Sequence, residues 1–347
     1  MTSRPRAWAA IALCAPILIV IALAACHARP KSQTVNFSIL STDSAQGLQT
    51  RWAPFIADMR KQTGLDIKPY FASNYTSLVE AMRFDQTQLG WFSNFSGLAA
   101  VRRGGGEVFA RTTDPSGIDG YFSVLIVNAK SGLTLDKVLK CDKTLNFGVG
   151  DANSTSGTLA PITYLFAPRQ IRPTDCFKTV RAANHQTNFA AVANNVLDVA
   201  TNNTTGLSMN QARDPALRAR VKVIWTSPRL PEDPIIWRKD LDPAIKAKIQ
   251  RFFFSYGVGS GPEAERQRAN LAKLSMGPFK HATDDHLLPV REMEASQNLE
   301  LAREAKDPAK IKAAQAVLDG LKTERAAAEA RGSVERLPSD LAGGGAP

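Results

Sequence analysis

The sequence predicts an α/β fold with two domains, the first of which is discontinuous. Three observations lead to this prediction. Apolar segments of strand and helix character alternate along residues 34–229, which is the rhythm of α/β domains. Two segments, Tyr121–Asn128 and Trp225–Ile236, have the character of chain crossings between two halves. After Trp237 the chain has helical patterns and little strand signal, as expected of segments that return to the first domain. A cleft between the two domains follows from this layout.

The length and composition agree with this fold class. A chain of 347 residues is long enough for two domains with separate hydrophobic cores. A hydrophobic content of 44% and a charged content of 22% are those of an ordinary globular protein. The formal net charge is +11, but the Lys and Arg residues are scattered, without a long basic run or interleaved aromatic residues. We therefore expect a mild bias toward anionic partners and no nucleic-acid binding.

The N-terminal segment has the pattern of a secretory signal peptide. Arg4 and Arg6 precede an apolar stretch at residues 7–22, which is too short and wrongly flanked for a stable membrane-spanning helix. We expect residues 1–25 to be removed on export.

The end of this segment, Leu23–Cys26, resembles a bacterial lipobox, in which the cysteine is lipidated and becomes the new N-terminus. We expect lipidation at Cys26, followed by a short polar tether at residues 26–33. A plain cleaved signal with a chance cysteine is the alternative. A lipidated protein is tethered to a membrane face and does not span the bilayer.

Two cysteines lie in the globular part of the exported chain, Cys141 and Cys176. An oxidising compartment outside the cytoplasm favours a disulfide bond between them, and two buried free thiols are the alternative. No His or Cys lies at ligand spacing beside either residue, so we expect no metal site.

The first half of the chain has alternating strand and helix patterns. Apolar residues recur at helical spacing in three segments, 48–59 (with Gly64 as its stop), 77–84 and 96–103. Strand character marks the segments 35–40, 65–71, 89–92, 108–111 and 121–127. The last of these is continuously apolar, which favours a central position in a sheet. We assign residues 34–125, together with 230–290, to the first domain.

A second α/β run, residues 126–229, is expected to form the second domain. Its strand-like segments are 144–147, 177–182, 197–201 and 221–226, and its helix-like segments are 134–139, 158–167 and 189–194. Two further helices, at 243–256 and 263–274, belong to the part of the chain that returns to the first domain.

The C-terminal part reads as a helical extension at residues 291–335, followed by a Gly-rich tail at 336–347 that is expected to be disordered. Four apolar residues of the extension recur at 3-4-3 spacing: Ile311, Ala314, Leu318 and Leu321. This pattern suits a coiled-coil seam or a homodimer contact. Because it covers barely two heptads, a helix that packs on its own globule or extends into solvent is favoured.

One stretch, Gly148–Gly157, combines glycines with three successive hydroxyl residues between a strand pattern and a helix pattern. Glycines allow a tight turn and close approach of the backbone to a ligand. Ser154 is a suitable N-cap, and Thr155 and Ser156 follow it. The first N–H groups of a helix lack partners and carry partial positive charge, so this junction is a candidate anion site. An ordinary helix N-cap is the alternative. No Gly-Lys-Ser/Thr follows, so nucleotide hydrolysis is not indicated.

Several motifs, in the right order, resemble the substrate-binding proteins of phosphonate ABC transporters. The segments that carry the resemblance are Phe71–Tyr75, Gly120–Leu125, Gly150–Gly157, Asn184–Asn188, Asp198–Asn203 and Pro231–Arg238. The resemblance covers roughly residues 35–291. It implies the two-domain periplasmic binding protein fold of type II, with a hinge, a ligand cleft between the lobes and closure over the ligand.

The resemblance also implies which residues hold the phosphonate. The expected phosphonate-binding residues are Ser154, Thr155, Ser156, His185, Tyr75 and Tyr121. The hydroxyls and helix N–H groups would bind the oxygens, and the tyrosines would close from the other domain. The charge of His185 is expected to follow pH near neutrality. In the alternative readings, the tyrosines are packing aromatics and His185 caps a turn.

At the substituent end the chain departs from the family pattern. Two carboxylates of the family can receive the ammonium of an aminoalkyl phosphonate; Asp233 matches one, and the other position falls on Thr205. Loss of one charge-assisted bond costs on the order of 1–3 kcal/mol. We therefore expect a weaker preference for 2-aminoethylphosphonate and relatively better binding of simple alkylphosphonates. Asp233 could instead stabilise only its own loop. Trp91 and Phe92 are expected in the core rather than in the cleft.

The sequence thus predicts a periplasmic, lipid-anchored binding protein that captures a phosphonate and delivers it to an ABC transporter permease. No cofactor and no catalysis are expected, because no set of nucleophile, base and orienting residue is found. The alternatives are a binding protein for phosphate, phosphite or hypophosphite, a sensor module for a signalling receptor, and a phosphoester or phosphonate hydrolase.

Overall fold

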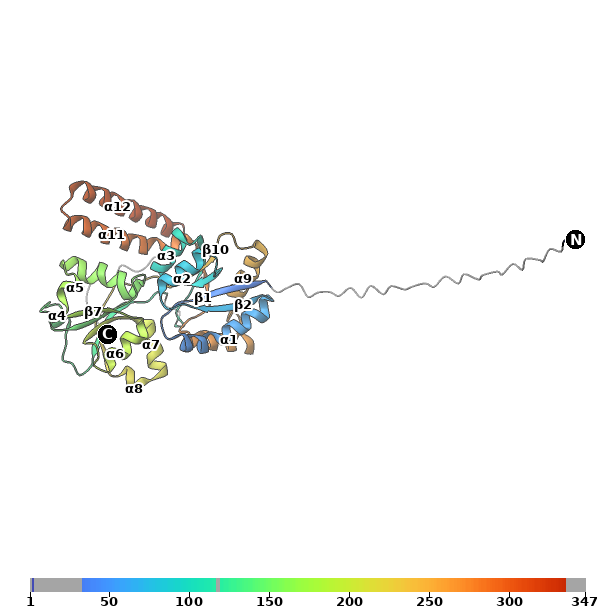
Figure 1. Ribbon diagram of the computed structural model, residues 1–347, viewed down its shortest axis with the longest axis horizontal. Helices are drawn as coiled ribbons and strands as arrows, with labels where there is room; N and C mark the ends of the chain where they lie inside the picture. Colours follow the sequence, from blue (N-terminus) through green and yellow to red (C-terminus); the bar gives the residue numbers. More distant parts are fainter. Residues whose placement is uncertain (1, 3–32, 117–118, 335–347) are drawn as a thin grey trace. The chain divides into compact units, whose positions relative to one another are not determined.

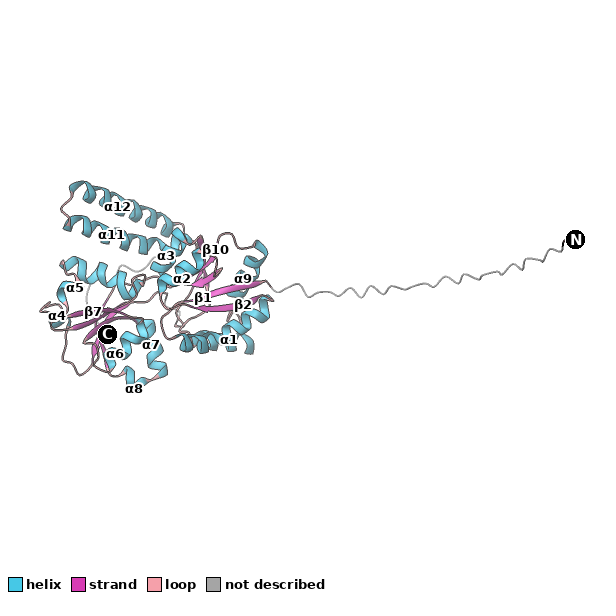
Figure 2. Ribbon diagram, in the orientation of Figure 1, coloured by secondary structure: helices cyan, strands magenta, loops and turns pink. Residues whose placement is uncertain are grey.

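The computed structural model describes Thr2 and residues 33–116 and 119–334. The expected signal peptide, the lipidation site Cys26, the tether up to residue 32 and the C-terminal tail from residue 336 lie outside the described residues. Residues 33–334 belong to one compact unit. Figure 2 shows the strands of this unit gathered into sheets with helices around them.

The first sheet has six strands in the order β11-β4-β10-β3-β1-β2. The strands are β1 (Thr34–Ile39), β2 (Asp66–Phe71), β3 (Leu89–Trp91), β4 (Gly106–Arg111), β10 (Pro234–Arg238) and β11 (Lys280–His281). β1 pairs parallel with β2 and β3, whereas β10 inserts antiparallel between β3 and β4. The sheet therefore combines segments from both ends of the chain, as the discontinuous layout requires. We call this sheet and its flanking helices lobe 1.

Helices cover both faces of the lobe 1 sheet. On one face α1 (Ala45–Thr63), α9 (Pro243–Ser255) and α10 (Pro262–Ala272) pack on Phe37 and its neighbours in β1. On the other face lie α2 (Tyr75–Arg83) and α3 (Asn94–Arg103). In α1, Trp52 and Phe55 follow the helical spacing seen in the sequence, and both are almost fully buried.

The second sheet has five strands in the order β7-β6-β8-β5-β9. The strands are β5 (Ser123–Asn128), β6 (Asn146–Val149), β7 (Thr179–Ala182), β8 (Val199–Asn203) and β9 (Val221–Thr226). Alternate residues of β5 point to opposite faces. Val124 and Ile126 face one core, and Leu125 and Val127 face the other. We call this sheet and its helices, residues 123–226, lobe 2.

The helices of lobe 2 lie on both faces of its sheet. One core includes α6 (His185–Ala193) and α7 (Thr204–Arg213), and α8 (Pro215–Arg218) follows α7. The other core includes α4 (Leu135–Val138), α5 (Pro173–Cys176) and the helical segment that follows β6. That segment consists of η1 (Thr155–Leu159), η2 (Ile162–Phe166) and η3 (Ala167–Arg169), and the first two are π-helical. π-turns within helices are frequent at functional sites.

The chain crosses between the lobes twice, and the two crossings pair with each other. Tyr121 and Leu230 form an antiparallel bridge, with N···O distances of 3.0 and 2.7 Å. All of β5 belongs to lobe 2, so the first crossing ends before Ser123 and not at residue 125. This bridge links the two sheets next to the site described below.

The C-terminal extension forms two antiparallel helices. η4 (Asp284–Leu287) leads into α11 (Leu288–Glu304), and α12 (Pro308–Ala330) packs back along it (Figure 1). Leu318 and Leu321 of the 3-4-3 pattern are buried against α11, and Ile311 and Ala314 pack on the same cluster. This seam is therefore used within the chain, as in the intramolecular alternative.

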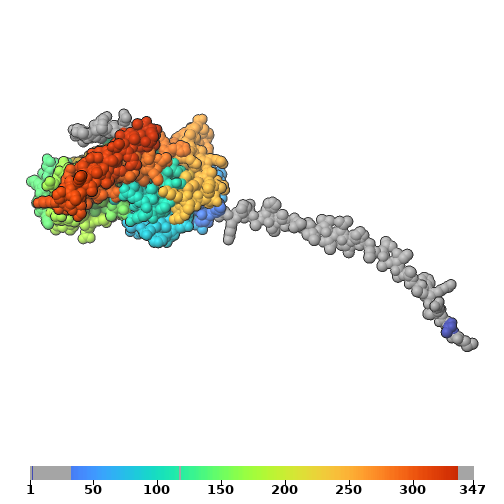
Figure 3. Space-filling view, turned by 90° about the horizontal axis from the view of Figure 1, so that it is seen from above, coloured from blue at the N-terminus to red at the C-terminus, as the bar shows by residue number. Residues whose placement is uncertain are grey.

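α11 contacts both lobes. It packs against α3 and η4 of lobe 1 and against η1 and η2 of lobe 2. In Figure 3 the two helices form the long orange-to-red ridge across the visible surface. The helix that opens with Thr155 is thus supported from the side of the C-terminal extension.

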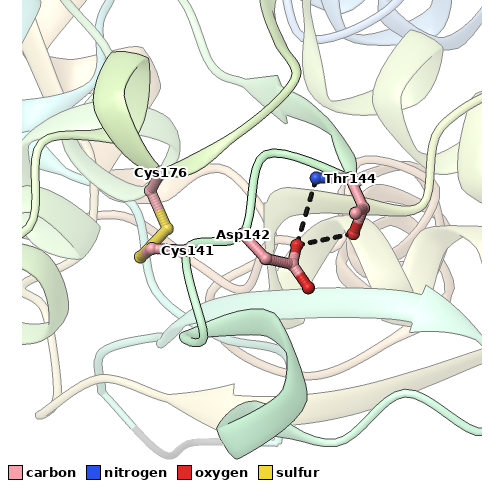
Figure 4. The surroundings of a disulfide bond; sticks show 4 residues. All are labelled: Cys141, Asp142, Thr144 and Cys176. Atoms are coloured by element: carbon pink, nitrogen blue, oxygen red, sulfur yellow. Dashed lines mark hydrogen bonds between the residues drawn. A yellow bond between two sulfur atoms is a disulfide. The ribbon is translucent and has the colours of Figure 1, made fainter.

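Cys141 and Cys176 form a disulfide bond in the structure, which was one of the two alternatives left open by the sequence (Figure 4). The bond joins the loop after α4 to the end of α5. In that loop Asp142 accepts hydrogen bonds from the backbone N–H and the hydroxyl of Thr144, at 3.1 and 2.6 Å. Thr144 precedes β6, so the disulfide fixes the approach to this strand.

Among residues 33–116 and 119–334, no helix has both the length and the apolar character needed to cross a bilayer.

Candidate functional site

The glycine- and hydroxyl-rich stretch forms a tight turn between β6 and η1. Gly150 and Gly157 approach so closely that a Cβ on Gly150 would lie 2.5 Å from the Cα of Gly157. Ser154 is the N-cap, and its Oγ accepts from the N–H of Gly157 at 2.9 Å. We call residues Ser154–Gly157 the oxyanion nest.

The first two N–H groups of η1, on Thr155 and Ser156, have no acceptor among the hydrogen bonds of the described residues. Both residues are almost fully buried. Unpaired, buried N–H groups at a helix N-terminus carry partial positive charge and are costly unless an acceptor reaches them. The arrangement is that of an anion site, which favours the functional reading of this stretch over an ordinary N-cap.

Lobe 1 closes directly over the oxyanion nest. The N–H of Tyr75, at the start of α2, donates to Asp151 Oδ2 at 3.0 Å. The N–H of Phe95, in the first turn of α3, donates to Thr155 Oγ1 at 2.8 Å. The N-termini of α2 and α3 therefore meet the N-terminus of η1, and their partial positive charges converge on one place.

The hydroxyl of Ser156 lies at the centre of a polar cluster. Its Oγ is 3.4 Å from Nε2 of His185 and accepts from Nδ2 of Asn203 at 3.1 Å. The hydroxyls of Ser156 and Ser154 lie close enough to the phenols of Tyr121 and Tyr75, respectively, to lower their pKa, but without the geometry of a full hydrogen bond. The expected phosphonate-binding residues of both lobes are thus brought together around the nest.

Both tyrosines are buried, and their phenols are held in the neutral, hydrogen-bonding form. Burial, followed by the nearby Asp233 carboxyl, raises the pKa of Tyr75 and of Tyr121 above the usual value of a phenol. Tyr121 also lies 3.4 Å from Asp233 Oδ1, at the distance of a weak hydrogen bond. Tyr121 therefore presents its O–H group at the cavity wall, whereas Tyr75 does not line the cavity and lies in an apolar cluster of lobe 1.

The structure corrects the expectation that the charge of His185 follows pH near neutrality. His185 is the first residue of α6, capped by Asn184, and only 6% of its surface is exposed. Burial lowers the pKa of this imidazole to about 4, so the ring is neutral at pH 7. Its Nδ1 atom is buried without a hydrogen-bond partner among the described residues. A neutral ring can still serve as a hydrogen-bond donor.

A cavity of about 870 Å³ lies between the lobes; its lining includes residues that approach the nest, but no residue of the nest itself and not Tyr75. Its inner wall includes Tyr121, His185 and Asn203, all of which approach the Ser156 hydroxyl, and its outer part reaches the first turns of α1. Thr205 and Asp233, the two positions expected at the substituent end, both line this cavity. The two positions expected at the substituent end therefore lie on one cavity with Tyr121 and His185.

Two adjacent carboxyl groups line the lobe 1 side of the cavity. Burial, followed by the Glu232 charge, raises the pKa of Asp233 well above its usual value. Burial raises the pKa of Glu232 to about 7, although hydrogen bonds from Thr112 Oγ1 (3.1 Å) and Gly120 N (3.2 Å) lower it. Such a pair would favour a cationic group between or beside its members. Asp233 thus lines the cavity, and a role in stabilising its own loop remains compatible with this position.

Trp91 corrects a second expectation. It lines the cavity, whereas Phe92 is fully buried in the core as predicted. The indole N–H of Trp91 faces Asp233 closely enough to lower the pKa of this carboxyl, but without the geometry of a full hydrogen bond. At the end of β3, Trp91 therefore contributes both packing and a buried donor.

Sequence analysis missed several residues of the site. The motif that contains Asn203 was noted in the sequence, but its hydrogen bond to Ser156 was not predicted. Glu232, which directly precedes Asp233, was not predicted to line the cavity. Asp151 lies within the central stretch, but its bond to Tyr75 joins residues 76 positions apart, which no local pattern reveals. Among residues 33–116 and 119–334, no group of three or more His, Cys, Asp or Glu residues is placed to hold a metal ion.

Comparisons with known proteins point in one direction. Residues 37–287 match the family described as "ABC transporter, phosphonate, periplasmic substrate-binding protein". The chain is 40% identical over 321 residues to the phosphonates-binding periplasmic protein of Escherichia coli K12, covering 90% of this chain and 93% of that one.

Two solved structures agree in fold. The binding protein component of a Pseudomonas aeruginosa ABC phosphonate transporter superimposes with a TM-score of 0.82 and 38% identity, covering 86% of this chain and 99% of that chain. A Prochlorococcus marinus protein in complex with methylphosphonate gives a TM-score of 0.67 at 20% identity, covering 77% and 98%. The fold is therefore that of the periplasmic binding proteins.

Proposed function

Because the chain belongs to the family of periplasmic substrate-binding proteins of phosphonate ABC transporters, we propose that it captures a phosphonate between its two lobes and delivers it to the transporter permease. The observation that carries this proposal is the oxyanion nest. Its two unpaired N–H groups, on Thr155 and Ser156, are buried beside three hydroxyls at the contact between the lobes. A tetrahedral oxyanion is the kind of ligand that satisfies them.

The phosphonate oxygens are held by groups of both lobes. Ser154, Thr155, Ser156 and His185 bind from lobe 2, and Tyr75 and Tyr121 bind from the lobe 1 side. Hydrogen bonds to a charged group contribute ~1.5–3 kcal/mol each. About five of them, after the cost of association, support roughly micromolar or tighter binding.

The substituent of the ligand extends toward Asp233 and Thr205. Burial and the neighbouring Glu232 raise the pKa of Asp233, which lies within weak hydrogen-bonding distance of Tyr121, and this opposes the ionised form that pairs with an ammonium group. Thr205 offers only a neutral hydroxyl. The gain from an amine is therefore small: 2-aminoethylphosphonate binds no more than about tenfold more tightly than methylphosphonate.

We further propose that the exported protein is anchored in the membrane through a lipid on Cys26 and that it performs no catalysis. The lipobox-like sequence Leu23–Cys26 supports the first point. The family, whose members serve transporters as binding subunits, supports the second. Mass spectrometry of the membrane-extracted protein tests the anchor, which would appear as an acylated N-terminal Cys26.

Isothermal titration calorimetry of the exported form tests the proposed ligand class. The ligands are methylphosphonate, 2-aminoethylphosphonate, phosphate and phosphite. We expect both phosphonates to bind more tightly than phosphate and phosphite. Ser156→Ala should weaken phosphonate binding by about 10- to 100-fold, because it removes one hydroxyl bonded to the ligand.

Ser131→Ala is the matched control, since Ser131 bonds only within its own turn of lobe 2. Tighter binding of phosphite or phosphate than of either phosphonate would replace the proposed ligand. A much tighter aminoethyl complex would refute the assignment of the substituent end.

A further inference from the structure

The outer part of the cavity carries a second cluster of charged groups that the oxyanion nest does not use. Asp43 and Arg51 come from lobe 1 and Arg213 from α7 of lobe 2, and all three line the cavity. Asp43 Oδ2 is 3.0 Å from Arg51 Nη1 and 3.1 Å from Arg213 Nη1. One carboxylate therefore lies between two guanidinium groups, one from each lobe.

The charges of this cluster do not balance. Burial would raise the pKa of Asp43, but hydrogen bonds from Ser44 N and from Arg51 lower it below its usual value, so Asp43 is ionised. Two guanidinium groups and one carboxylate leave a net charge of +1 in a half-buried place. An additional anion would complete the cluster.

The hydrogen bonds of Arg51 show where such an anion would bind. Its Nε and Nη2 atoms are buried and have no partner among the described residues, whereas Nη1 is held by Asp43. Nε and Nη2 form one edge of the guanidinium plane, and this edge binds a carboxylate through two parallel hydrogen bonds. Leaving charged donors buried and unpaired is costly.

Asp43 cannot satisfy this edge, because its oxygens are already engaged. Oδ1 accepts from Ser44 N at 2.7 Å, and Oδ2 accepts from both arginines. Arg213 is likewise tied on two sides, to Asp43 and to Asn210 Oδ1 at 2.9 Å. The unpaired edge of Arg51 is therefore the donor pair that remains for a ligand.

We propose that Arg51, together with Arg213, forms a second anion subsite that binds the distal carboxylate of a carboxyalkylphosphonate whose phosphonate group occupies the oxyanion nest. This inference rests on the proposed function. The cavity of about 870 Å³ that Arg51 and Arg213 line is also lined by His185 and Asn203, which contact the Ser156 hydroxyl of the nest, so a ligand longer than methylphosphonate could extend from the nest through it. Both nitrogens are shielded from water in the closed arrangement, so the carboxylate enters before the lobes close or as the Arg51 side chain turns. Because Arg213 belongs to the opposite lobe, closure completes the subsite.

The test compares ligands of equal chain length with and without the carboxylate. Phosphonoacetate, 3-phosphonopropionate and 4-phosphonobutyrate are each titrated calorimetrically against the alkylphosphonate with the same number of carbons. We expect the carboxylate to increase the affinity of at least one chain length by about tenfold or more.

Variants locate the effect. In Arg51→Met the gain from the carboxylate disappears, while the affinity for methylphosphonate changes less than about threefold. Arg51→Lys keeps a charge but not the two-donor edge and loses most of the gain. Arg218→Met is the control, because Arg218, at the end of α8, donates to Val221 O in β9 and does not line the cavity. Thermal melting checks that each variant folds. If Arg51→Met does not fold, the loss of the carboxylate gain in Arg51→Lys tests the second subsite.

The outcomes are distinct. If no phosphonate binds the wild-type protein, the proposed function fails. If methylphosphonate binds but no carboxylate improves affinity at any length, or if the gain survives in Arg51→Lys and Arg51→Met, the second subsite is wrong.

Discussion

The Oγ1 atom of Thr155 accepts a hydrogen bond from the backbone N–H of Phe95 at 2.8 Å. Thr155 opens η1 of lobe 2, and Phe95 lies in the first turn of α3 in lobe 1. The hydroxyl therefore satisfies a helix N–H group of the opposite lobe and still has its own proton to donate to a ligand. If the proposed function holds, this side chain links ligand binding to the contact between the lobes.

Thr155→Val should therefore weaken both binding and closure. Valine has nearly the same shape, but it leaves the Phe95 N–H without an acceptor, which costs about 1–3 kcal/mol. We expect the dissociation constant for methylphosphonate to rise by about tenfold or more in calorimetric titrations. Small-angle scattering at a fixed, subsaturating ligand concentration should show a larger radius of gyration than for the wild type.

Thr155→Ser is the matched control, because it keeps the hydroxyl and should bind within about threefold of the wild type. Equal affinities of Thr155→Val and Thr155→Ser would mean that the hydroxyl does not link the lobes.

Glu232 should make stability depend on pH. Burial raises its pKa to about 7 in the folded protein, from a usual value of 4.5. A carboxyl with a raised pKa stabilises the folded state below its unfolded pKa, and this contribution is lost as pH rises through the folded pKa. Glu232→Gln removes this dependence, so the variant should gain stability relative to the wild type between pH 4.5 and 8, by on the order of 3 kcal/mol.

Urea unfolding of both proteins across this pH range measures the difference. The quantity compared is the change in the free energy of unfolding with pH. The substitution also alters the hydrogen bonds from Thr112 and Gly120, but this adds a constant that does not change the slope. Glu265→Gln, at an exposed position of α10, serves as the control. Parallel curves for Glu232→Gln and the wild type would contradict a protonated Glu232.

The sequence was sufficient where the signal is local. The spacing of Leu48, Trp52 and Phe55 predicted α1, and the Ser154 hydroxyl predicted the N-cap of η1, because helix periodicity and capping depend on near neighbours. The resemblance of whole motifs to a known family added the two-lobe fold, which local patterns alone do not specify.

Other features depend on the folded environment and could not be read from the sequence. His185 looks like any histidine near a turn, yet burial at the start of α6 lowers the pKa of its ring to about 4. Trp91 reads as a core residue, because only the pairing of β3 with β10, far apart in the sequence, places it beside Asp233. The unpaired edge of Arg51 requires knowledge of every neighbouring acceptor.

The disulfide bond should stabilise lobe 2 without affecting the ligand site. Cys141 and Cys176 are separated by 35 residues, and closing a loop of this length restricts the unfolded chain by roughly 3–4 kcal/mol. We expect Cys141→Ser/Cys176→Ser to melt at a temperature roughly 5–15 °C below that of the wild type.

At 25 °C the double variant should bind methylphosphonate with unchanged affinity, because neither cysteine lines the cavity. Treatment of the wild type with a reductant should reproduce the lower melting temperature and have no effect on the double variant. A melting temperature that does not respond to either change would show that the bond contributes little to stability.

His185 should bind the ligand as a neutral donor between pH 6 and 8. Burial lowers the pKa of the ring to about 4, and Nε2 lies 3.4 Å from the Ser156 hydroxyl. If the ring gained its proton in this range, affinity for an anion would rise as pH falls, and a variant without the ring would lack this rise. We instead expect plots of log Kd against pH for the wild type and His185→Gln to be parallel, because any remaining slope comes from the ligand.

Calorimetry in two buffers of different ionisation enthalpy should show equal proton uptake for both proteins. A steeper slope and greater uptake in the wild type would mean that the bound phosphonate draws a proton onto His185, and the ring would then act as a cation.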